Sequence, residues 1–263
     1  MLLGKTGCGK SSLGNIILGD SLLKVKLSPN SETDECQKES KIVNGIRTTV
    51  IDTPGFFDTK MPEEALKREI IRCLVECAPG PHAFLIVLKV DRYTDQEKDI
   101  IKKVREYFSE EALKHAVVVF THGDQLPEGK KIEDFVREND DLNDLVKRCG
   151  GRCHVVDNRY WNNNKHGDYR SNQFQVTQLL NTIETLKTRQ SVYTNELLKD
   201  VQRNKDKGVH WLYYLFAGVA VGALLGGFFG AVIYKTLGCA VVGGFAGGAI
   251  GGVIGARLGI TKR

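Results

Sequence analysis

Gly4-Lys5-Thr6-Gly7-Cys8-Gly9-Lys10-Ser11 fits the phosphate-binding pattern G-x-x-x-x-G-K-[ST] without a mismatch. An apolar strand fragment, Met1-Leu2-Leu3, precedes the stretch and a helical pattern over residues 11–18 follows it, which is the context that the motif requires. The glycines let successive backbone N–H groups curl around a phosphate, and the helix adds the positive end of its dipole. The stretch therefore predicts a P-loop nucleoside-triphosphatase, and a plain glycine-rich turn is the weaker alternative.

Apolar runs alternate with helical periodicities along the rest of the chain. Strands are expected at residues 82–90, 116–120 and 153–156, and a β-hairpin is expected at 41–43 and 47–52 around Asn44-Gly45. Helices are expected at residues 62–77, 95–108, 132–149 and 172–205, the last with a break near Arg189, and residues 20–40 are expected to form a loop. Buried strands that alternate with amphipathic helices predict an α/β fold with a doubly wound sheet.

The net charge of +5 is distributed unevenly over the 263 residues. Residues 211–263 hold four basic side chains and no acidic ones, which leaves 33 of the 37 basic residues against 32 acidic residues in 1–210. The first 210 residues are therefore nearly neutral, which argues against a nucleic-acid-binding protein.

The last fifty residues have the composition of a membrane hairpin. Residues 211–233 and 237–256 carry no charge, and each run is long enough to span a bilayer. Glycines recur every four residues in both runs, which is typical of closely packed membrane helices. Basic residues flank the outer ends, so we expect a transmembrane hairpin over 211–263 with both ends in the cytosol. A glycine-rich soluble domain and a hairpin that dips only partway into the bilayer are the alternatives.

The second strand of the predicted β-hairpin ends at Asp52-Thr53-Pro54-Gly55. A carboxylate at that position faces the phosphate loop and can hold Mg²⁺ through water. We expect the Gly55 N–H to sense a γ-phosphate, although Pro54-Gly55 alone could be an ordinary turn.

Thr121-His122-Gly123-Asp124 follows the strand predicted at 116–120, where GTPases usually carry Asn-Lys-x-Asp. The two carboxylate oxygens of Asp124 can accept hydrogen bonds from guanine N1–H and the 2-amino group, a pattern that adenine does not offer. His122 could stack on the purine. Asp157-Asn158-Arg159 follows the last short strand, where GTPases have a second base-contacting loop, but this signal alone is weak.

Four stretches carry a family resemblance: residues 80–85 (GPHAFL), 91–97 (DRYTDQE), 120–124 (FTHGD) and 149–152 (CGGR). Over about residues 1–190, the chain resembles the GTPases of immunity-associated proteins (the GIMAP or IAN family), relatives of septins and of chloroplast-import GTPases. The resemblance implies a Ras-like or septin-like G domain of the AIG type over 1–190. A helical linker is expected over 191–210, between this domain and the hairpin predicted at 211–263. It also implies a homodimer or oligomer that forms through the nucleotide face when GTP is bound.

The resemblance and the motifs together give a predicted site for GTP or GDP with Mg²⁺. The nucleotide contacts are Gly4, Lys5, Thr6, Gly7, Cys8, Gly9, Lys10, Ser11, Ser12, Asp52, Gly55, His122, Gly123, Asp124 and Asn158, and the metal ligands are Ser11, Thr33 and Asp52. The sequence departs from the family in two places: relatives have a longer first strand, so this one is expected to be incomplete, and they often carry Asn at the position of Asp157.

Hydrolysis is expected to be slow. Ras-like enzymes orient the attacking water with a Gln just after the Asp-x-x-Gly motif, whereas this chain has Phe56 and Phe57. Thr33 is the candidate switch threonine, with Ser31 as a competing choice, and Arg92 is the candidate charge donor in a dimer, although an ordinary solvated loop arginine is an equal alternative. The sequence therefore predicts a slow GTPase on the cytosolic face of an internal membrane, or alternatively a GTP-dependent scaffold that does not hydrolyse. Endoplasmic reticulum, mitochondria, Golgi and lysosome all fit.

Overall fold

The computed structural model describes residues 1–25, 36–55, 62–163, 168–196, 198–199 and 202–203. The chain divides into two compact units, Met1–Thr194 and Asn195–Arg263, and the sheet and all described candidate site residues belong to the first. No helix among the residues described is long and apolar enough to cross a membrane. The hairpin predicted at 211–263 lies outside the described residues, as does half of the linker predicted at 191–210.

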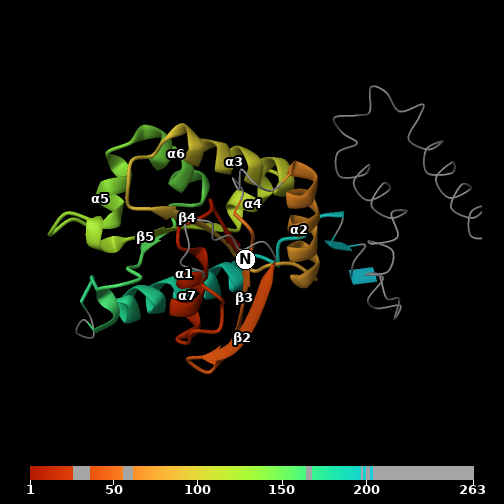
Figure 1. Cartoon of the computed structure of the whole chain (residues 1–263), viewed down its shortest axis with the longest axis horizontal. Helices are drawn as coiled ribbons and strands as arrows, with labels where there is room; N and C mark the ends of the chain where they lie inside the picture. The colour runs from red at the N-terminus through yellow and green to blue at the C-terminus, as the bar shows by residue number, and fades with distance from the viewer. Residues whose placement is uncertain (26–35, 56–61, 164–167, 197, 200–201, 204–263) are drawn as a thin grey trace, which may run out of the picture. The chain divides into compact units, whose positions relative to one another are not determined.

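The described residues of the first unit form one six-stranded sheet with the order β2-β3-β1-β4-β5-β6 (Figure 1). Its strands are β1 (Leu2–Leu3), β2 (Gln37–Val43), β3 (Ile46–Asp52), β4 (Phe84–Lys89), β5 (Ala116–Thr121) and β6 (Cys153–Val155). β2 is antiparallel to β3 across the Asn44-Gly45 turn, and the remaining neighbours are parallel. The predicted hairpin and the parallel, doubly wound sheet are thus confirmed, and the sheet as a whole is mixed.

Helices connect the strands and cover the sheet. They are α1 (Lys10–Leu18), α2 (Glu63–Glu76), α3 (Asp95–Phe108), α4 (Glu111–Lys114), α5 (Ile132–Arg137), α6 (Asp140–Arg148) and α7 (Asn172–Arg189), with short 3₁₀ turns η1 (Gly123–Gln125) and η2 (Trp161–Asn163). The predicted break near Arg189 is confirmed, since α7 ends there.

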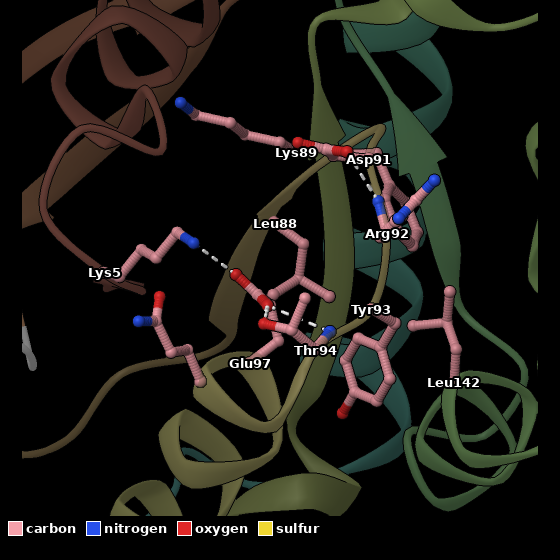
Figure 2. A pocket seen from close by; sticks show the side chains of 11 residues that line it. Lys5, Leu88, Lys89, Asp91, Arg92, Tyr93, Thr94, Glu97 and Leu142 are labelled. Carbon is pink, nitrogen blue, oxygen red and sulfur yellow. Dashed lines mark hydrogen bonds and ion pairs between the residues drawn. The ribbon is translucent and has the colours of Figure 1, made fainter.

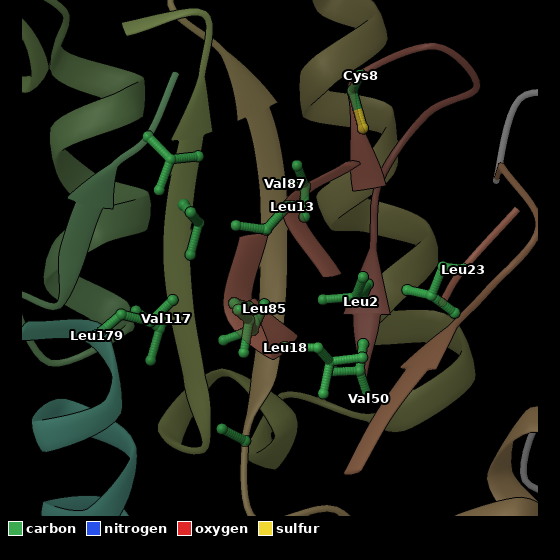
Figure 3. Close-up of a cluster of buried hydrophobic side chains, with 14 of the residues drawn as sticks. Leu2, Cys8, Leu13, Leu18, Leu23, Val50, Leu85, Val87, Val117 and Leu179 are labelled. Carbon is green, nitrogen blue, oxygen red and sulfur yellow. The ribbon is translucent and has the colours of Figure 1, made fainter. Parts of the chain in front are cut away.

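Alternating side chains of the central strands pack against helices on opposite faces of the sheet. Leu85 and Val87 of β4 belong to the buried cluster that includes Leu13 of α1 and Leu179 of α7 (Figure 3). On the other face the Phe84 ring lies 5.0 Å from the ring of Phe108 in α3. The parallel strands therefore have both faces covered and their carboxyl ends free to carry loops.

Two sequence expectations are wrong. Residues 20–40 were expected to form a loop, but β2 begins at Gln37 and its alternately exposed side chains mark a polar edge strand. A single helix was expected over 132–149, but the chain forms α5 and α6, with Asn139 between them. The Asn139 side chain accepts a hydrogen bond from the Leu142 N–H at 2.9 Å, so it caps the second helix and ends the first.

Candidate functional site

The phosphate loop connects β1 to α1 at the carboxyl edge of the sheet. Gly9, the residue before α1, has φ +90°, and a Cβ at this position would lie 2.8 Å from Asn158 Nδ2. A side chain at Gly9 would therefore be both strained and too close to Asn158. Gly7 also has a positive φ, of +74°. These conformations turn the loop back over the amino end of α1, where free N–H groups can bind an anion.

Lys10 lies inside the phosphate loop. Its residue is 6% exposed, and its ammonium donates to the carbonyl oxygens of Gly4 at 3.2 Å and Lys5 at 3.0 Å. A buried ammonium needs such partners, and a phosphate would offer it charged ones. The structure thus places Lys10 where the sequence predicts it, with its charge directed into the loop.

Ser11 and Asp52 meet at the expected metal position. The Ser11 hydroxyl donates to Asp52 Oδ2 at 2.5 Å, while Oδ1 of the same carboxylate is buried without a partner. Burial raises the pKa of Asp52, against the opposing effects of Lys10 and Ser11. A hydroxyl and a carboxylate are ligands that Mg²⁺ prefers, so the residues present fit this ion. Thr33, the third predicted ligand, lies outside the described residues.

Gly55 packs against the phosphate loop, since a Cβ there would lie 2.5 Å from the backbone N of Thr6. Thr6 Oγ1 is itself buried without a partner. Among the described residues, six buried side-chain polar atoms lack a hydrogen-bond partner, and three of them, on Thr6, Asp52 and Asn158, surround this loop. Such atoms are rare in native proteins, and the three around this loop could accept or donate hydrogen bonds to a ligand bound there.

Thr121 connects the end of β5 to the phosphate loop. Its Oγ1 lies 2.7 Å from the carbonyl oxygen of Cys8, 3.2 Å from that of Leu88 and 3.0 Å from His122 Nδ1. His122 has φ +59°, so the chain turns sharply after the strand. Asp124 follows in η1, half-buried, and its Oδ2 accepts a hydrogen bond from Gln125 Nε2 at 2.6 Å. The predicted base-binding residues and the phosphate loop therefore share one edge of the sheet.

Asp157 and Asn158 follow β6 and lie beside η1. Asp157 accepts hydrogen bonds from the backbone N–H groups of Arg159 and Tyr160, and the Asp124 N–H lies 3.4 Å from its Oδ2. Burial alone would raise the pKa of Asp157, but these donors outweigh it and the pKa is lowered. Asp157 thus accepts the hydrogen bonds that shape this loop.

Three residues that are not among the predicted nucleotide contacts support this loop. A Cβ on Gly123 would lie 2.6 Å from the buried Trp161 ring, so Trp161 packs directly against the backbone of η1. Asn172, at the start of α7, accepts from the Asp157 N–H at 3.0 Å and donates to the Asp157 carbonyl at 2.6 Å. Thr121, described above, is the third. No local pattern signals these contacts, because each joins residues far apart in the chain.

Asn172→Ala is expected to destabilise the protein by about 3 kcal/mol, because it leaves the buried N–H and C=O of Asp157 without partners. Denaturant unfolding of the mutant measures this effect. Asn181→Ala, on the exposed side of the same helix, is the matched control and should change the free energy of unfolding by less than about 0.5 kcal/mol. Equal unfolding midpoints for both mutants would contradict the role of Asn172.

Arg92 lies on the loop between β4 and α3, which faces the phosphate loop. Together with Lys5 it lines a pocket of about 300 Å³ (Figure 2). Arg92 is exposed, and its backbone N–H donates to Asp91 Oδ1 at 2.7 Å. The Lys5 side chain points into the same pocket and forms an ion pair with Glu97 at 2.5 Å, while the Lys5 backbone remains part of the phosphate loop.

Ser12, the last predicted contact of the phosphate loop, is half-buried in the first turn of α1.

Comparison with known proteins identifies the family to which this chain is similar. The model of the AIG1 family matches residues 1–210. Immune-associated nucleotide-binding protein 13 of Arabidopsis thaliana is 31% identical over 209 residues, and human GTPase IMAP family member 8 is 34% identical over 186 residues. The matches cover 78% and 71% of this chain, and the chain spans 61% and 27% of the two relatives.

Solved structures share the fold. Toc33 from Arabidopsis thaliana in complex with Mg²⁺ and GMPPNP has a TM-score of 0.54 at 20% identity, over 72% of this chain and 83% of that one. A structure from work on the chloroplast translocon components atToc33 and psToc159, which reports that dimerization is important for their GTPase activity, has a TM-score of 0.58 at 22% identity, over 72% and 82%. These likenesses establish an α/β P-loop GTPase fold.

Proposed function

The chain belongs to the AIG1 family, and we propose that it binds GTP and GDP with Mg²⁺ at the carboxyl edge of β1, β4 and β5. The observation that carries this proposal is the meeting of the phosphate loop, Asp52 and the Thr121–Asp124 segment, with three unpartnered buried polar atoms around the loop. The Toc33 structure with Mg²⁺ and GMPPNP supports the choice of ligand.

Each part of the site has its own role in binding. The backbone N–H groups from Gly4 to Ser12 surround the phosphates, and Lys10 supplies the cation that contacts them. Ser11 and Asp52 hold the metal, together with Thr33 as the predicted switch ligand, and the Gly55 N–H senses the γ-phosphate. Bound Mg²⁺ supplies positive charge that neutralises the phosphate oxygens. His122, Gly123, Asp124 and Asn158 contact the base.

Hydrolysis is proposed to be slow and to depend on a homodimer formed through the nucleotide face. Because Phe56 replaces the water-orienting Gln, the isolated subunit should turn over on the order of 10⁻⁴ s⁻¹ or slower. Arg92 is the proposed charge donor, supported by its place on the edge that carries the phosphate loop. The dependence on dimerization reported for the Toc33 and Toc159 components is in line with this proposal. The Phe56-Phe57 pair equally favours the alternative of a GTP-dependent scaffold that does not hydrolyse.

Single-turnover GTP hydrolysis, measured at increasing protein concentration, separates these two functions. A rate that rises with concentration supports the dimeric enzyme, and a negligible rate at every concentration supports the scaffold. Calorimetry with GTP and ATP tests the shared premise, since equal affinities would contradict a guanine-nucleotide site.

The tail is proposed to anchor the protein in an internal membrane through residues 211–256, with the G domain and Arg263 in the cytosol. We expect deletion of residues 209–263 to release a soluble protein with unchanged GTP affinity, because Asn158 is the last predicted nucleotide contact. Titration of fluorescent GTP into both forms tests the affinity. Extraction of the full chain from membranes by alkaline carbonate would contradict a spanning tail and favour one that lies on the surface.

A further inference from the structure

Glu97, in the first turn of α3, connects two segments of the proposed site. Its Oε1 forms an ion pair with Lys5 Nζ at 2.5 Å, and its Oε2 accepts from the Thr94 N–H at 3.1 Å and from the Thr94 hydroxyl (Figure 2). Lys5 is the second residue of the phosphate loop, and Thr94 ends the loop that carries Arg92. One carboxylate therefore bridges the phosphate loop and the Arg92 loop.

The contacts to Thr94 have an ordinary structural explanation, but the contact to Lys5 does not. Thr94 and Glu97 form a capping box, in which the Glu side chain satisfies the N-cap N–H. That motif uses one oxygen and works equally well on a solvent-exposed helix. Here the Glu97 residue is only 8% exposed, and its second oxygen is directed at a different segment of the chain.

Hydrogen bonds from Lys5 and Thr94 favour the ionised form of the Glu97 carboxyl group. Burial alone would raise the pKa of this carboxyl group, but the hydrogen bonds from Lys5 and Thr94 outweigh burial and lower the pKa. A buried carboxylate is stable only when it is paired in this way, so removal of Lys5 or of the Glu97 charge should loosen the bridge.

We infer that Glu97 is a positioning residue that couples the phosphate loop to the Asp91–Thr94 loop and so fixes where Arg92 lies. The inference rests on the proposed function, in which Arg92 acts as charge donor. Arg92 is exposed, so the place of its guanidinium depends on the path of its loop. That path is tied to the phosphate loop through Glu97.

Glu97→Gln is the variant that isolates the bridge. Glutamine can still serve in a capping box, but it has no charge for Lys5. Asp95→Asn is the matched control, because it makes the same change two residues earlier, where the carboxylate is exposed and pairs with Lys98 at 3.4 Å. The double variant Arg92→Ala with Glu97→Gln tests whether Glu97 acts through Arg92.

The first measurement is hydrogen exchange without nucleotide. Backbone amides of residues 91–94 should exchange about tenfold faster in Glu97→Gln than in the wild type, the change that a loss of about 1.4 kcal/mol of local stability produces, and Asp95→Asn should match the wild type. Equal exchange in the two variants would overturn the inference. This measurement needs no GTP, so it decides the inference even if calorimetry shows that the wild type does not bind guanine nucleotides.

The second measurement is single-turnover hydrolysis at a concentration where the wild type dimerises. Glu97→Gln should lower this rate about tenfold or more, as expected for a misplaced catalytic group, with GTP affinity and thermal midpoint close to the wild type. The double variant should be no slower than Arg92→Ala alone. Multiplied losses in the double variant, or a parallel fall in GTP affinity and thermal midpoint, would overturn the positioning role and leave Glu97 as a structural residue.

Discussion

Lys10→Ala is expected to weaken GTP binding at least about a hundredfold, because it removes two charge-assisted hydrogen bonds to the phosphates, worth about 1.5–3 kcal/mol each and so at least about 3 kcal/mol together. Lys10 is 6% exposed and its ammonium reaches two carbonyl oxygens of the phosphate loop, so its charge is already in place before a ligand arrives. Ser11→Asn should have a similar effect in the presence of Mg²⁺, since it replaces the hydroxyl that contacts Asp52. Titration with a fluorescent GTP analogue measures both losses.

Lys41→Ala provides the matched control for Lys10. Lys41 lies on the edge strand β2 and forms an exposed ion pair with Asp20 at 3.2 Å, away from the phosphate loop. Its removal should leave GTP affinity unchanged. If Lys10→Ala and Ser11→Asn also retain the wild-type affinity while both remain folded, the phosphate loop is misassigned.

The parts of the fold that could be predicted are those with a local signature. The phosphate loop, the Asn44-Gly45 turn and the apolar strands at β4 and β5 each depend on residues close together in sequence. β2 was predicted too short because it is a polar edge strand, whose side chains alternate in exposure without an apolar run. A polar edge strand with lysines resists pairing with another sheet. Its composition is also close to that of a loop, so the sequence pattern did not distinguish the two.

The split between α5 and α6 could have been found. Glu138-Asn139-Asp140 is a polar run in the middle of the predicted helix, and Asn followed by an acidic residue is a typical helix start. Periodicity alone continues across the break, because Val136 and Leu142 are both buried. The cap at Asn139 outweighs this continuity.

The residues predicted to contact the nucleotide belong to motifs that are local in sequence. The residues that hold these motifs in place come from distant parts of the chain. Thr121 reaches Cys8, Asn172 reaches Asp157, and Glu97 reaches Lys5, each through packing of separate elements. These contacts depend on how the strands are aligned and how the helices pack, which the sequence patterns do not specify. The motifs therefore predicted the site residues but not the residues that hold them in place.

Asp124→Asn is expected to reverse the base preference of the protein. Asp124 is half-buried in η1, at the edge of the sheet that carries the phosphate loop, and its carboxylate can only accept hydrogen bonds. Guanine presents two donors, N1–H and the 2-amino group, whereas xanthine has a carbonyl in place of the amino group and so requires a donor. An amide supplies that donor and leaves one guanine donor without a good partner.

The expected change follows from the cost of mismatched polar groups. A site built to hydrogen-bond a group on its ligand rejects an analogue that lacks the match by about 10⁴-fold, so Asp124→Asn should lose most of its GTP affinity and gain affinity for XTP. Competition of GTP and XTP against a fluorescent analogue on wild type and mutant measures the reversal. Asp157→Asn is the control for an indirect effect through the loop, because its amide oxygen can still accept the Arg159 and Tyr160 N–H groups and the change weakens only the 3.4 Å contact to the Asp124 N–H. If both mutants keep the preference for GTP, the base lies elsewhere and Asp124 serves only to shape η1, where it already accepts a hydrogen bond from Gln125.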